Sequence, residues 1–407
     1  MTSHWLSDLG MLTRLTRDIR SFLQAPVTVE QAGGIVKQRL AMREERFLTM
    51  AGQAIFKRPR SPYLRLLRAA GCELGDFKSL VDREGLDGAL SRLVEDGVYV
   101  TFDEFKGRKE AVRGSQRFSF FEEDFDNPSV SPHVEARSGG TRSAGTSVKI
   151  HFSYLGELAV NTALTLHSHG FSKHDHVIWL HEGFSALIPM LIYAKLGRLP
   201  IAWFYPLKPL PLKAHVASRY LILLGRLLGY FFPTPVFLDL RDPGTMAMWL
   251  ANYLNKKKGR SVCVTTYASS AVRIAAAAHE KGISLDGVCF ITLGEPFTDA
   301  KQKTIEAAGA RSLVRYAHTQ GWGRCRSTSL APRSVFHRVQ RDVRWKSDWV
   351  RLWLRRWIYR RLLRRQNLQL DRGLQGKQTI TEANIEIEPF PYEKACVGKD
   401  LKSSSPV

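Results

Sequence analysis

From residue 155 to residue 316 the sequence alternates short apolar runs with amphipathic segments of helical length. The short runs predict strands at Val177–Leu180, Ile201–Tyr205, Val236–Leu240, Val262–Thr266, Val288–Leu293 and Ser312–Tyr316. The longer segments predict helices at Leu155–His167, Phe184–Leu196, Tyr220–Phe231, Thr245–Asn255, Ser269–Lys281 and Phe297–Ala308. Because such alternation builds βαβ units, we predict an α/β fold with mostly parallel sheets flanked by helices.

Before residue 111 the pattern is mainly helical, with one short apolar run at Val98–Thr101 that we predict as a strand. The predicted helices span residues 4–24, Val29–Phe56, Tyr63–Ala70 and Leu86–Glu95. We divide the chain into a helical region at 1–110, an α/β core at 111–321 and a basic, atypical tail at 322–407.

The composition is that of a globular protein, with 407 residues and 44% hydrophobic positions. Five cysteines stand alone without a CxxC pair, which argues against a zinc ribbon and a disulfide framework. Charged residues within the first twenty positions argue against a secretory leader. The most apolar span, Tyr220–Leu238, contains Arg226 and two prolines, so we predict a buried helix and a strand there. We expect a cytoplasmic protein.

The formal net charge of +22 comes largely from one segment. Residues 324–372 contain 15 Lys and Arg residues against three Asp and Glu residues. Tryptophans recur there at spacing four, but arginines surround the whole helical circumference, which is not a clean amphipathic face. Two interpretations stay open, a basic extension for RNA or membrane surfaces and a segment read in the wrong frame of the coding DNA. We favour the second, so we do not expect nucleic acid or a membrane as a partner of the tail.

The segment Ala136–Thr146 is rich in glycine and hydroxyl side chains. Glycines let the backbone approach a ligand closely, and hydroxyl and arginine groups donate to phosphates. No Gly-Lys-Ser/Thr ends the segment, so it is not a Walker A loop. A strand predicted at Ser147–Phe152 places it at a hairpin or a strand edge. A flexible linker has a similar composition and remains an alternative.

Two further loops follow predicted strands, at Leu293–Thr298 and at Tyr316–Gly321. Ligands of parallel sheets bind at the carboxyl ends of the strands, where both loops lie. The first loop is also compatible with a simple Gly-Pro turn in which Thr298 caps a helix. The second combines an aromatic, a hydroxyl and an amide, which suit a base and a phosphate, but an ordinary polar loop has the same composition.

In this order and spacing, the three loops resemble the core motifs of the adenylate-forming (ANL) superfamily. More narrowly, the chain resembles the phenylacetate–CoA ligase and coenzyme F390 synthetase branch over about residues 40–320. The quoted motifs are Ser138-Gly139-Gly140-Thr141, Gly294-Glu295-Pro296 and Tyr316-x-x-Thr319, with Ser61–Arg65 and Tyr99–Phe105 as earlier matches.

The resemblance implies an acid–thiol ligase that activates a carboxylic acid with ATP and Mg²⁺ to an acyl-adenylate and transfers the acyl group to a thiol such as coenzyme A. It implies phosphate binding by Ser138, Gly139, Gly140, Thr141, Ser143 and Gly145. It also implies that Gly294, Glu295 and Pro296 border the adenine. Tyr316 would stack on the base, and Thr319 would bond the α-phosphate region. Thr141, Thr319 and Gln320 are the candidate catalytic residues, and no protein metal site is expected.

The chain departs from the family pattern at Gln320, where the family has an acidic residue that helps to place Mg²⁺. We find neither the family's ribose-binding aspartate nor its lysine-bearing C-terminal lid, so we expect the lid domain to be missing or replaced. The competing hypotheses are a degenerate homologue that binds nucleotide without turnover and a basic binding protein driven by the tail.

Two groups of side chains near the core allow two interpretations each. Aromatic residues could line an acyl pocket or fill the sheet core; they are Trp179, Phe184, Trp203, Phe204 and Tyr205. Histidines crowd fifteen residues and could hold a metal or end a helix and form a polar turn; they are His167, His169, His174, His176 and His181. We favour the core for the aromatics and the structural role for the histidines, with His181 as a candidate for the acyl pocket.

Overall fold

The computed structural model describes residues 2–126, 131–137, 147–181, 183–207, 212–316 and 324–325. The chain divides into two compact units, Met1–Arg351 and Leu352–Val407, and all described residues belong to the first. The predicted basic tail therefore lies almost wholly outside the described residues, and the predicted domain boundaries stay predictions.

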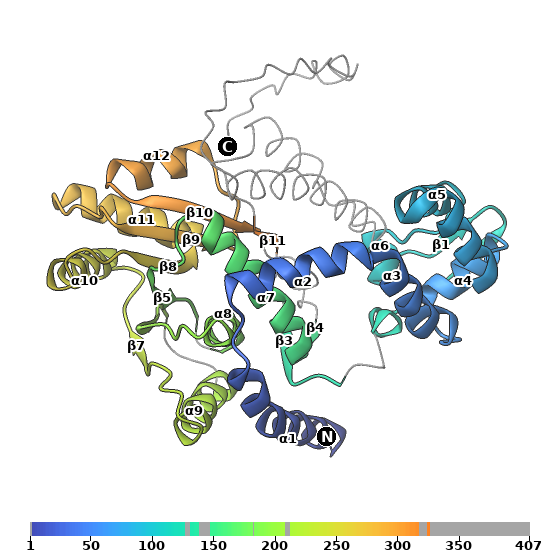
Figure 1. The fold of residues 1–407 in the computed structure, drawn as a ribbon, viewed down its shortest axis with the longest axis horizontal. Coiled ribbons are helices and arrows are strands. Elements are labelled where there is room, and N and C mark those ends of the chain that lie inside the picture. The colour runs from blue at the N-terminus through green and yellow to red at the C-terminus, as the bar shows by residue number, and fades with distance from the viewer. Residues whose placement is uncertain are drawn as a thin grey trace, which may run out of the picture. The chain divides into compact units, whose positions relative to one another are not determined.

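A seven-stranded sheet forms the centre of the described unit, in the order β11-β10-β9-β8-β5-β6-β7 (Figure 1). Its strands are β5 (Asp175–Trp179), β6 (Ala202–Tyr205), β7 (Pro235–Phe237), β8 (Val262–Tyr267), β9 (Val288–Leu293), β10 (Arg311–Tyr316) and β11 (Arg324–Cys325). Six strands run parallel, and β11 pairs antiparallel with β10. The predicted α/β fold with a parallel sheet is confirmed.

Helices cover both faces of the sheet because alternate strand residues point to opposite sides. One apolar cluster lies between the sheet and α1 (Thr2–Gln24), α7 (Phe152–Ser168), α8 (Phe184–Lys195) and α9 (Leu212–Leu227). The other lies between the sheet and α10 (Pro243–Lys256), α11 (Ala268–Glu280) and α12 (Asp299–Ala307). Ile178 faces the first cluster and its neighbours Val177 and Trp179 face the second, so β5 is buried on both sides.

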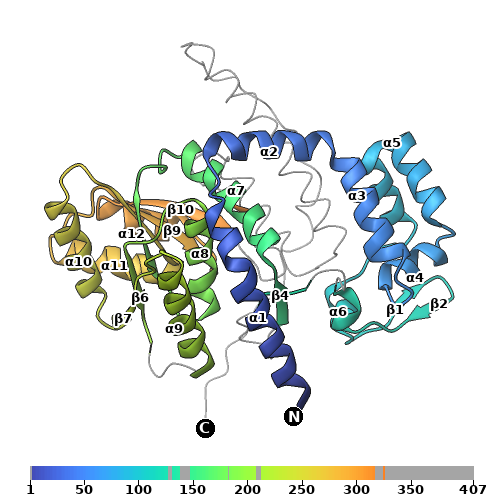
Figure 2. The same ribbon diagram turned by 60° about the horizontal axis from the view of Figure 1, so that its bottom comes forward.

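The N-terminal part is helical, as predicted (Figure 2). Its elements are α2 (Val29–Ala41), α3 (Arg43–Ala51), the π-helix η1 (Gly52–Phe56), α4 (Pro62–Ala69), α5 (Leu74–Glu95), α6 (Phe102–Phe105) and the 3₁₀-helix η2 (Glu122–Phe125). A short hairpin of β1 (Ala111–Arg113) and β2 (Gln116–Phe118) lies between α6 and η2. α1 contributes Ile19, Phe22 and Leu23 to the core beside the sheet.

Several sequence-based assignments differ from the structure. The predicted helix at Leu86–Glu95 is the second part of α5, because Gly85 takes the non-helical angles φ 67° and ψ 168° and divides α5 in two, but the first part, from Leu74, was missed. The predicted strand at Val98–Thr101 is a coil, since Thr101 starts the capping box of α6 with Glu104. α9 begins at Leu212, eight residues before the predicted Tyr220.

The end of α9 and β7 together account for the apolar span that the sequence singled out at residues 220–238. Throughout the ranges that the structure describes, no helix is both long and apolar enough to cross a membrane.

Two cysteine thiols lie side by side inside the sheet. Cys263 of β8 pairs in register with Cys289 of β9, and their side chains are 0% and 1% exposed. A hydrogen bond with Cys289 and burial raise the pKa of Cys263 well above its ordinary value. The Cys263 thiol is therefore protonated, and both thiols are closed off from solvent in the folded protein.

Candidate functional site

The sheet order brings two of the predicted loops to neighbouring strand ends. β9 and β10 are adjacent and parallel, with Thr292 opposite Val314. Gly294 and Tyr316 each come two residues after this pair, so their backbones lie at the same edge of the sheet. The side chain of Tyr316 lies outside the described residues, as do Thr319 and Gln320.

The third predicted loop is flanked by a hairpin. β3 (Val134–Arg137) pairs antiparallel with β4 (Ser147–Ile150), and Arg137 is opposite Ser147. The predicted position at a hairpin is thus found. The loop itself lies outside the described residues, and with it the predicted phosphate ligands Ser138, Gly139, Gly140, Thr141, Ser143 and Gly145.

Gly294 turns the chain sharply at the end of β9. Its φ is 78°, in the left-handed region that favours glycine. A Cβ at this position would meet the ring of Tyr267 at 3.1 and 3.2 Å. The turn therefore rests directly on Tyr267, the last residue of β8, and it needs glycine for both conformation and space.

Glu295 binds the first turn of α11. Its carboxylate accepts hydrogen bonds from the backbone N of Ser269 at 2.6 Å and from the Ser269 hydroxyl at 2.8 Å. A negative charge at a helix N-terminus is stabilised by the unpaired N–H groups and the helix dipole. Glu295 thus joins the end of β9 to the start of α11.

Pro296 and Thr298 complete a capped turn. The Lys301 ammonium donates to the Pro296 carbonyl at 2.6 Å, and the Thr298 hydroxyl accepts from the Lys301 backbone N at 3.4 Å. Thr298 is the N-cap of α12, as the simple Gly-Pro interpretation predicted. This contact explains the turn residues structurally, and it is compatible with a ligand at the same edge.

Tyr267 and His181 form the neighbouring part of the edge. Their ring centroids are 5.4 Å apart, and His181 follows β5, the strand next to β8. Burial lowers the pKa of His181, so its imidazole is neutral at pH 7. Burial raises the pKa of Tyr267, which also has a hydrogen bond with Ser185.

The sequence reasoning missed Tyr267 and Ser269. The only signal in the sequence was an aromatic residue at the end of a strand, followed by serines at the start of a helix. Both residues belong to the site because β8 lies beside β9, and this neighbour relation is set by the sheet order. The edge therefore consists of Tyr267, Ser269, Gly294, Glu295 and His181, with the backbone of Tyr316 next to it; we call it the strand-end site.

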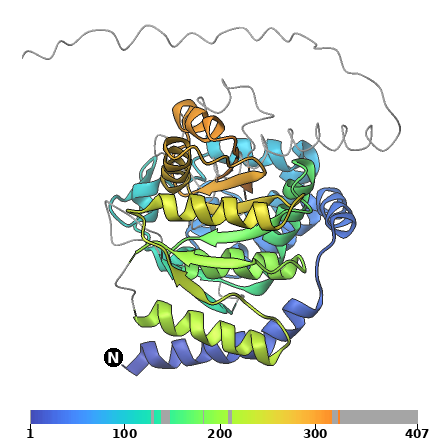
Figure 3. The ribbon, with the colours of Figure 1, turned by 90° about the vertical axis from the view of Figure 1, so that its left-hand side faces the viewer.

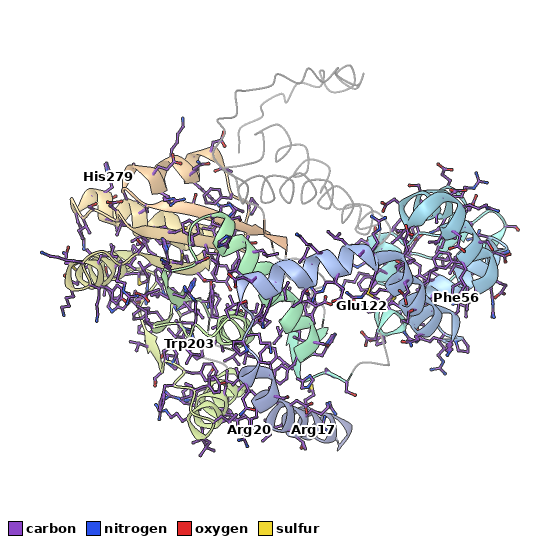
Figure 4. All side chains as sticks on the ribbon, in the orientation of Figure 1. Arg17, Arg20, Phe56, Glu122, Trp203 and His279 are labelled. Carbon is purple, nitrogen blue, oxygen red and sulfur yellow. The ribbon has the colours of Figure 1, made fainter. Side chains whose placement is uncertain are left out.

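The aromatic side chains proposed for an acyl pocket lie mainly in the core. Trp179, Trp203 and Phe204 are at most 6% exposed and belong to the two apolar clusters (Figure 4 labels Trp203). Tyr205 is half-buried at the end of β6 and lies 5.5 Å from Phe237 between ring centroids. The side chain of Phe184 lies outside the described residues.

The described histidines make separate structural contacts. His176 is buried against Tyr193, with ring centroids 4.1 Å apart, and His169 Nδ1 lies 2.8 Å from the Thr165 carbonyl at the end of α7. Within the described part of the chain, no group of three His, Cys, Asp or Glu residues is placed to hold a metal ion. Both carboxylate oxygens of Glu295 accept hydrogen bonds from Ser269.

Comparisons with known proteins assign the chain to no family. No model of a known protein family matches it, and neither does any curated protein. Among solved structures it is similar to the crystal structure of 2-hydroxyisobutyryl-CoA ligase in complex with 2-HIB-AMP and CoA in the thioesterification state. The identity is 14%, the TM-score is 0.37, and the match covers 69% of this chain and 50% of that chain.

A second solved structure, IdnL1, matches with 14% identity and a TM-score of 0.17 over 46% of this chain and 58% of that chain. The chain thus spans about half the length of the ligase and somewhat more of IdnL1. The narrower resemblance to the phenylacetate–CoA ligase branch stays a prediction.

Proposed function

We propose that the chain activates a carboxylic acid with ATP to an acyl-adenylate and passes the acyl group to a thiol such as coenzyme A. One observation supports this most directly. Gly294-Glu295-Pro296 and the Tyr316 end of β10, which lie far apart in sequence, come to adjacent parallel strand ends. Such edges are where parallel sheets bind nucleotides.

We assign the nucleotide base to the strand-end site, where a backbone turn and neighbouring rings support this proposal. Gly294 lets the turn lie flat against Tyr267, and Glu295 and Lys301 fix that turn from either side. We assign Gly294, Glu295 and Pro296 to the border of the adenine and Tyr316 to stacking on it, following the family resemblance. We assign His181, neutral at pH 7 and 5.4 Å from Tyr267 between ring centroids, to the acyl side of the site.

Phosphates and Mg²⁺ require other residues. Because Ser269 holds both carboxylate oxygens of Glu295, we give Glu295 a positioning role and not a metal-binding one. The hydroxyls and backbone N–H groups of residues 138–146, with Thr319 and Gln320, would hold the phosphates and their Mg²⁺. Bound Mg²⁺ would neutralise the charge that develops on the leaving pyrophosphate.

Acid-dependent exchange of radiolabelled pyrophosphate into ATP tests the proposal. The full chain is incubated with ATP, Mg²⁺ and a panel of aryl and medium-chain acids, each compared with an acid-free control. Exchange that requires one class of acid supports the proposal and names the substrate class. Absence of exchange with every acid contradicts turnover and favours the second candidate.

The second candidate is a degenerate homologue that binds nucleotide without turnover, and Gln320 is the residue that favours it. A neutral amide is a weaker ligand than a carboxylate for a hard cation. We expect Gln320→Glu to raise exchange by about tenfold or more if Mg²⁺ placement limits the reaction. Gln38→Glu on the exposed side of α2 adds the same charge elsewhere and should leave exchange unchanged. ATP binding by calorimetry without exchange in either variant would establish the degenerate homologue.

A further inference from the structure

The solvent side of α9 is unusually apolar. The outward-facing positions lie at helical spacing along the helix and continue past its end, and they are Leu212, Val216, Arg219, Leu223, Arg226, Leu227 and Phe231; we call them the α9 face. Leu212, Leu227 and Phe231 are 77%, 76% and 74% exposed. Single exposed apolar residues are common, but a contiguous set on one helix marks an interaction surface.

The opposite side of α9 already supplies what the fold needs. Leu221, Ile222 and Leu224 are buried in the core beside the sheet, and Ser218 is fully buried with them. The α9 face is therefore a second apolar side of a helix whose core side is already buried. Its leucines leave most of their surface open to solvent, with Leu223 at 59% and Leu227 at 76% exposed.

The end of α9 also directs an aromatic side chain outward. Gly225 has no Cβ, and this lets the ring of Phe232 fold beneath the helix, where it is 3% exposed. The backbone N of Tyr230 donates to the Gly225 carbonyl at 2.8 Å and closes the turn, with Gly229 at φ 82°. Because neighbouring residues point to opposite sides, Phe231 then projects into solvent.

The charge around these apolar side chains has one sign. α9 contains Lys213, Arg219 and Arg226 and no acidic residue, and residues 183–238 contain six Lys and Arg residues and no Asp or Glu. α1 lies alongside α9 (Figure 3), where Thr16 and Tyr220 share a hydrogen bond, and it adds the exposed Arg20 (Figure 4). A second copy docked through this face would bring like charges together.

Apolar side chains and arginines on one helix face, without acidic residues, match an anionic lipid surface. Leucine and phenylalanine enter the boundary between headgroups and acyl chains, while long arginine side chains reach back to the phosphates. We propose that the α9 face docks the protein reversibly on membranes that contain anionic lipid, with α9 lying in the plane of the headgroups. This proposal is independent of the proposed function and of the tail.

Vesicle flotation with the full chain tests the proposal. Vesicles with roughly one-third phosphatidylglycerol in phosphatidylcholine are compared with pure phosphatidylcholine at about 0.1 M salt. We expect the protein to float with the anionic vesicles. Its affinity for pure phosphatidylcholine should be lower by at least about tenfold, because each arginine near an anionic surface adds to the binding free energy. Raising the salt should release much of the bound protein. Absence of binding to anionic vesicles overturns the proposal.

Substitutions separate the apolar and the charged contributions. Leu223→Glu with Leu227→Glu should lower binding by about tenfold or more, because apolar burial is lost and negative charge is added. Arg219→Gln with Arg226→Gln should lower binding to anionic vesicles by about tenfold and weaken its salt dependence. The matched controls are Met248→Glu, which changes a 44% exposed apolar residue of α10, and Lys256→Gln with Arg273→Gln on α10 and α11.

All these positions are exposed, so circular dichroism and the melting temperature should stay unchanged and confirm folding. Binding that persists in Leu223→Glu/Leu227→Glu belongs to another part of the chain and overturns the proposal. The lipid proposal is also wrong if sedimentation shows a dimer that this variant converts to a monomer, since a second copy then occupies the face. Retained vesicle binding by the controls, together with loss in the α9 variants, supports it.

Discussion

α11 and α9 flank opposite faces of the same sheet, and they present contrasting surfaces to solvent. The exposed positions of α11 are Ser269, Arg273, His279 and Glu280, all of them polar (Figure 4 labels His279). Ile274 and four of its alanines are buried, namely Ala268, Ala271, Ala275 and Ala278, and Glu295 holds its first turn. On α9 the exposed positions are mostly Leu and Val, although the buried side is equally apolar.

This difference shows that an apolar side chain on a helix beside the sheet does not always lie in the core. Burying a leucine or isoleucine side chain is worth about 1.5–3 kcal/mol, and the fold obtains that stabilisation from Ile274 of α11 but not from the exposed leucines of α9. The apolar side of α11 is buried by its own chain, and the N-terminus of this helix contributes Ser269 to the strand-end site. In our proposal, the outer apolar side of α9 is buried only when the protein docks on a membrane.

Gly225→Ala acts on the α9 side of the comparison and should have the largest effect. The new Cβ would lie 2.3 Å from the Phe232 ring and 2.9 Å from the Tyr230 carbonyl, so the buried ring must leave its place. We expect about 3 kcal/mol of destabilisation in urea unfolding, together with a change in vesicle binding. Gly33→Ala in α2, where no atom lies within 4 Å, is the control and should be neutral or stabilising. An unchanged midpoint in Gly225→Ala would contradict the packing described here.

Gly294→Ala acts on the α11 side. The substitution places a side chain in the left-handed region and a Cβ at 3.1 Å from the Tyr267 ring. We expect about 2 kcal/mol of destabilisation and at least a tenfold loss of pyrophosphate exchange, because the turn is pushed away from Tyr267. Gly282→Ala has φ 65° but open space, so it isolates the backbone strain. Equal losses of exchange in both variants would show that the contact with Tyr267 is unimportant.

His176→Phe tests the sheet that both helices share. Burial, followed by the charges of Arg198 and His174, lowers the pKa of His176 to about 3. Below pH 6.5 this histidine is therefore protonated in the unfolded chain but neutral in the folded chain. The free energy of unfolding consequently falls as the pH falls toward 3. Between pH 7 and pH 5 this loss is slightly less than about 2 kcal/mol.

Phenylalanine keeps the ring contact with Tyr193 and should remove that part of the pH dependence. Urea unfolding at both pH values measures it, with His279→Phe on the exposed side of α11 as the control. Parallel pH profiles of wild type and His176→Phe would refute a neutral buried imidazole.

Glu295→Gln should have the smallest effect. The amide replaces one acceptor oxygen by a donor that faces the N–H and hydroxyl of Ser269, so about one hydrogen bond and the helix-dipole term are lost. We expect about 1 kcal/mol of destabilisation in urea unfolding. Glu306→Gln near the end of α12 keeps a hydrogen-bonding side chain and serves as the control. A larger effect on exchange than on stability would indicate a direct role of Glu295 toward the nucleotide.

Periodicity predicted the sheet and its helices because each βαβ unit repeats one local pattern. It failed where a neighbour decides the structure. The run Val98–Val100 looks like a strand, but Val98 and Val100 are buried as a coil before the capping box at Thr101. The first half of α9 was missed because its apolar positions face outward, against the usual relation between pattern and core.

The strand-end site was predictable in part. The loops after β9 and β10 were identified as candidates, since ligand-binding loops follow parallel strands. The contacts of Gly294 with Tyr267 and of Glu295 with Ser269 were not, because they join residues 26 or 27 positions apart through the β8–β9 pairing. Single-sequence patterns give the strands but not their order.

The paired thiols of β8 and β9 can report how often the folded sheet opens. Cys263 and Cys289 can react with a thiol reagent only when the sheet opens, and Cys72, 8% exposed, responds to opening of the N-terminal helices. Labelling followed by peptide mass analysis would therefore time the two openings separately in one sample. The slower of them identifies the part of the chain that holds its native state longest.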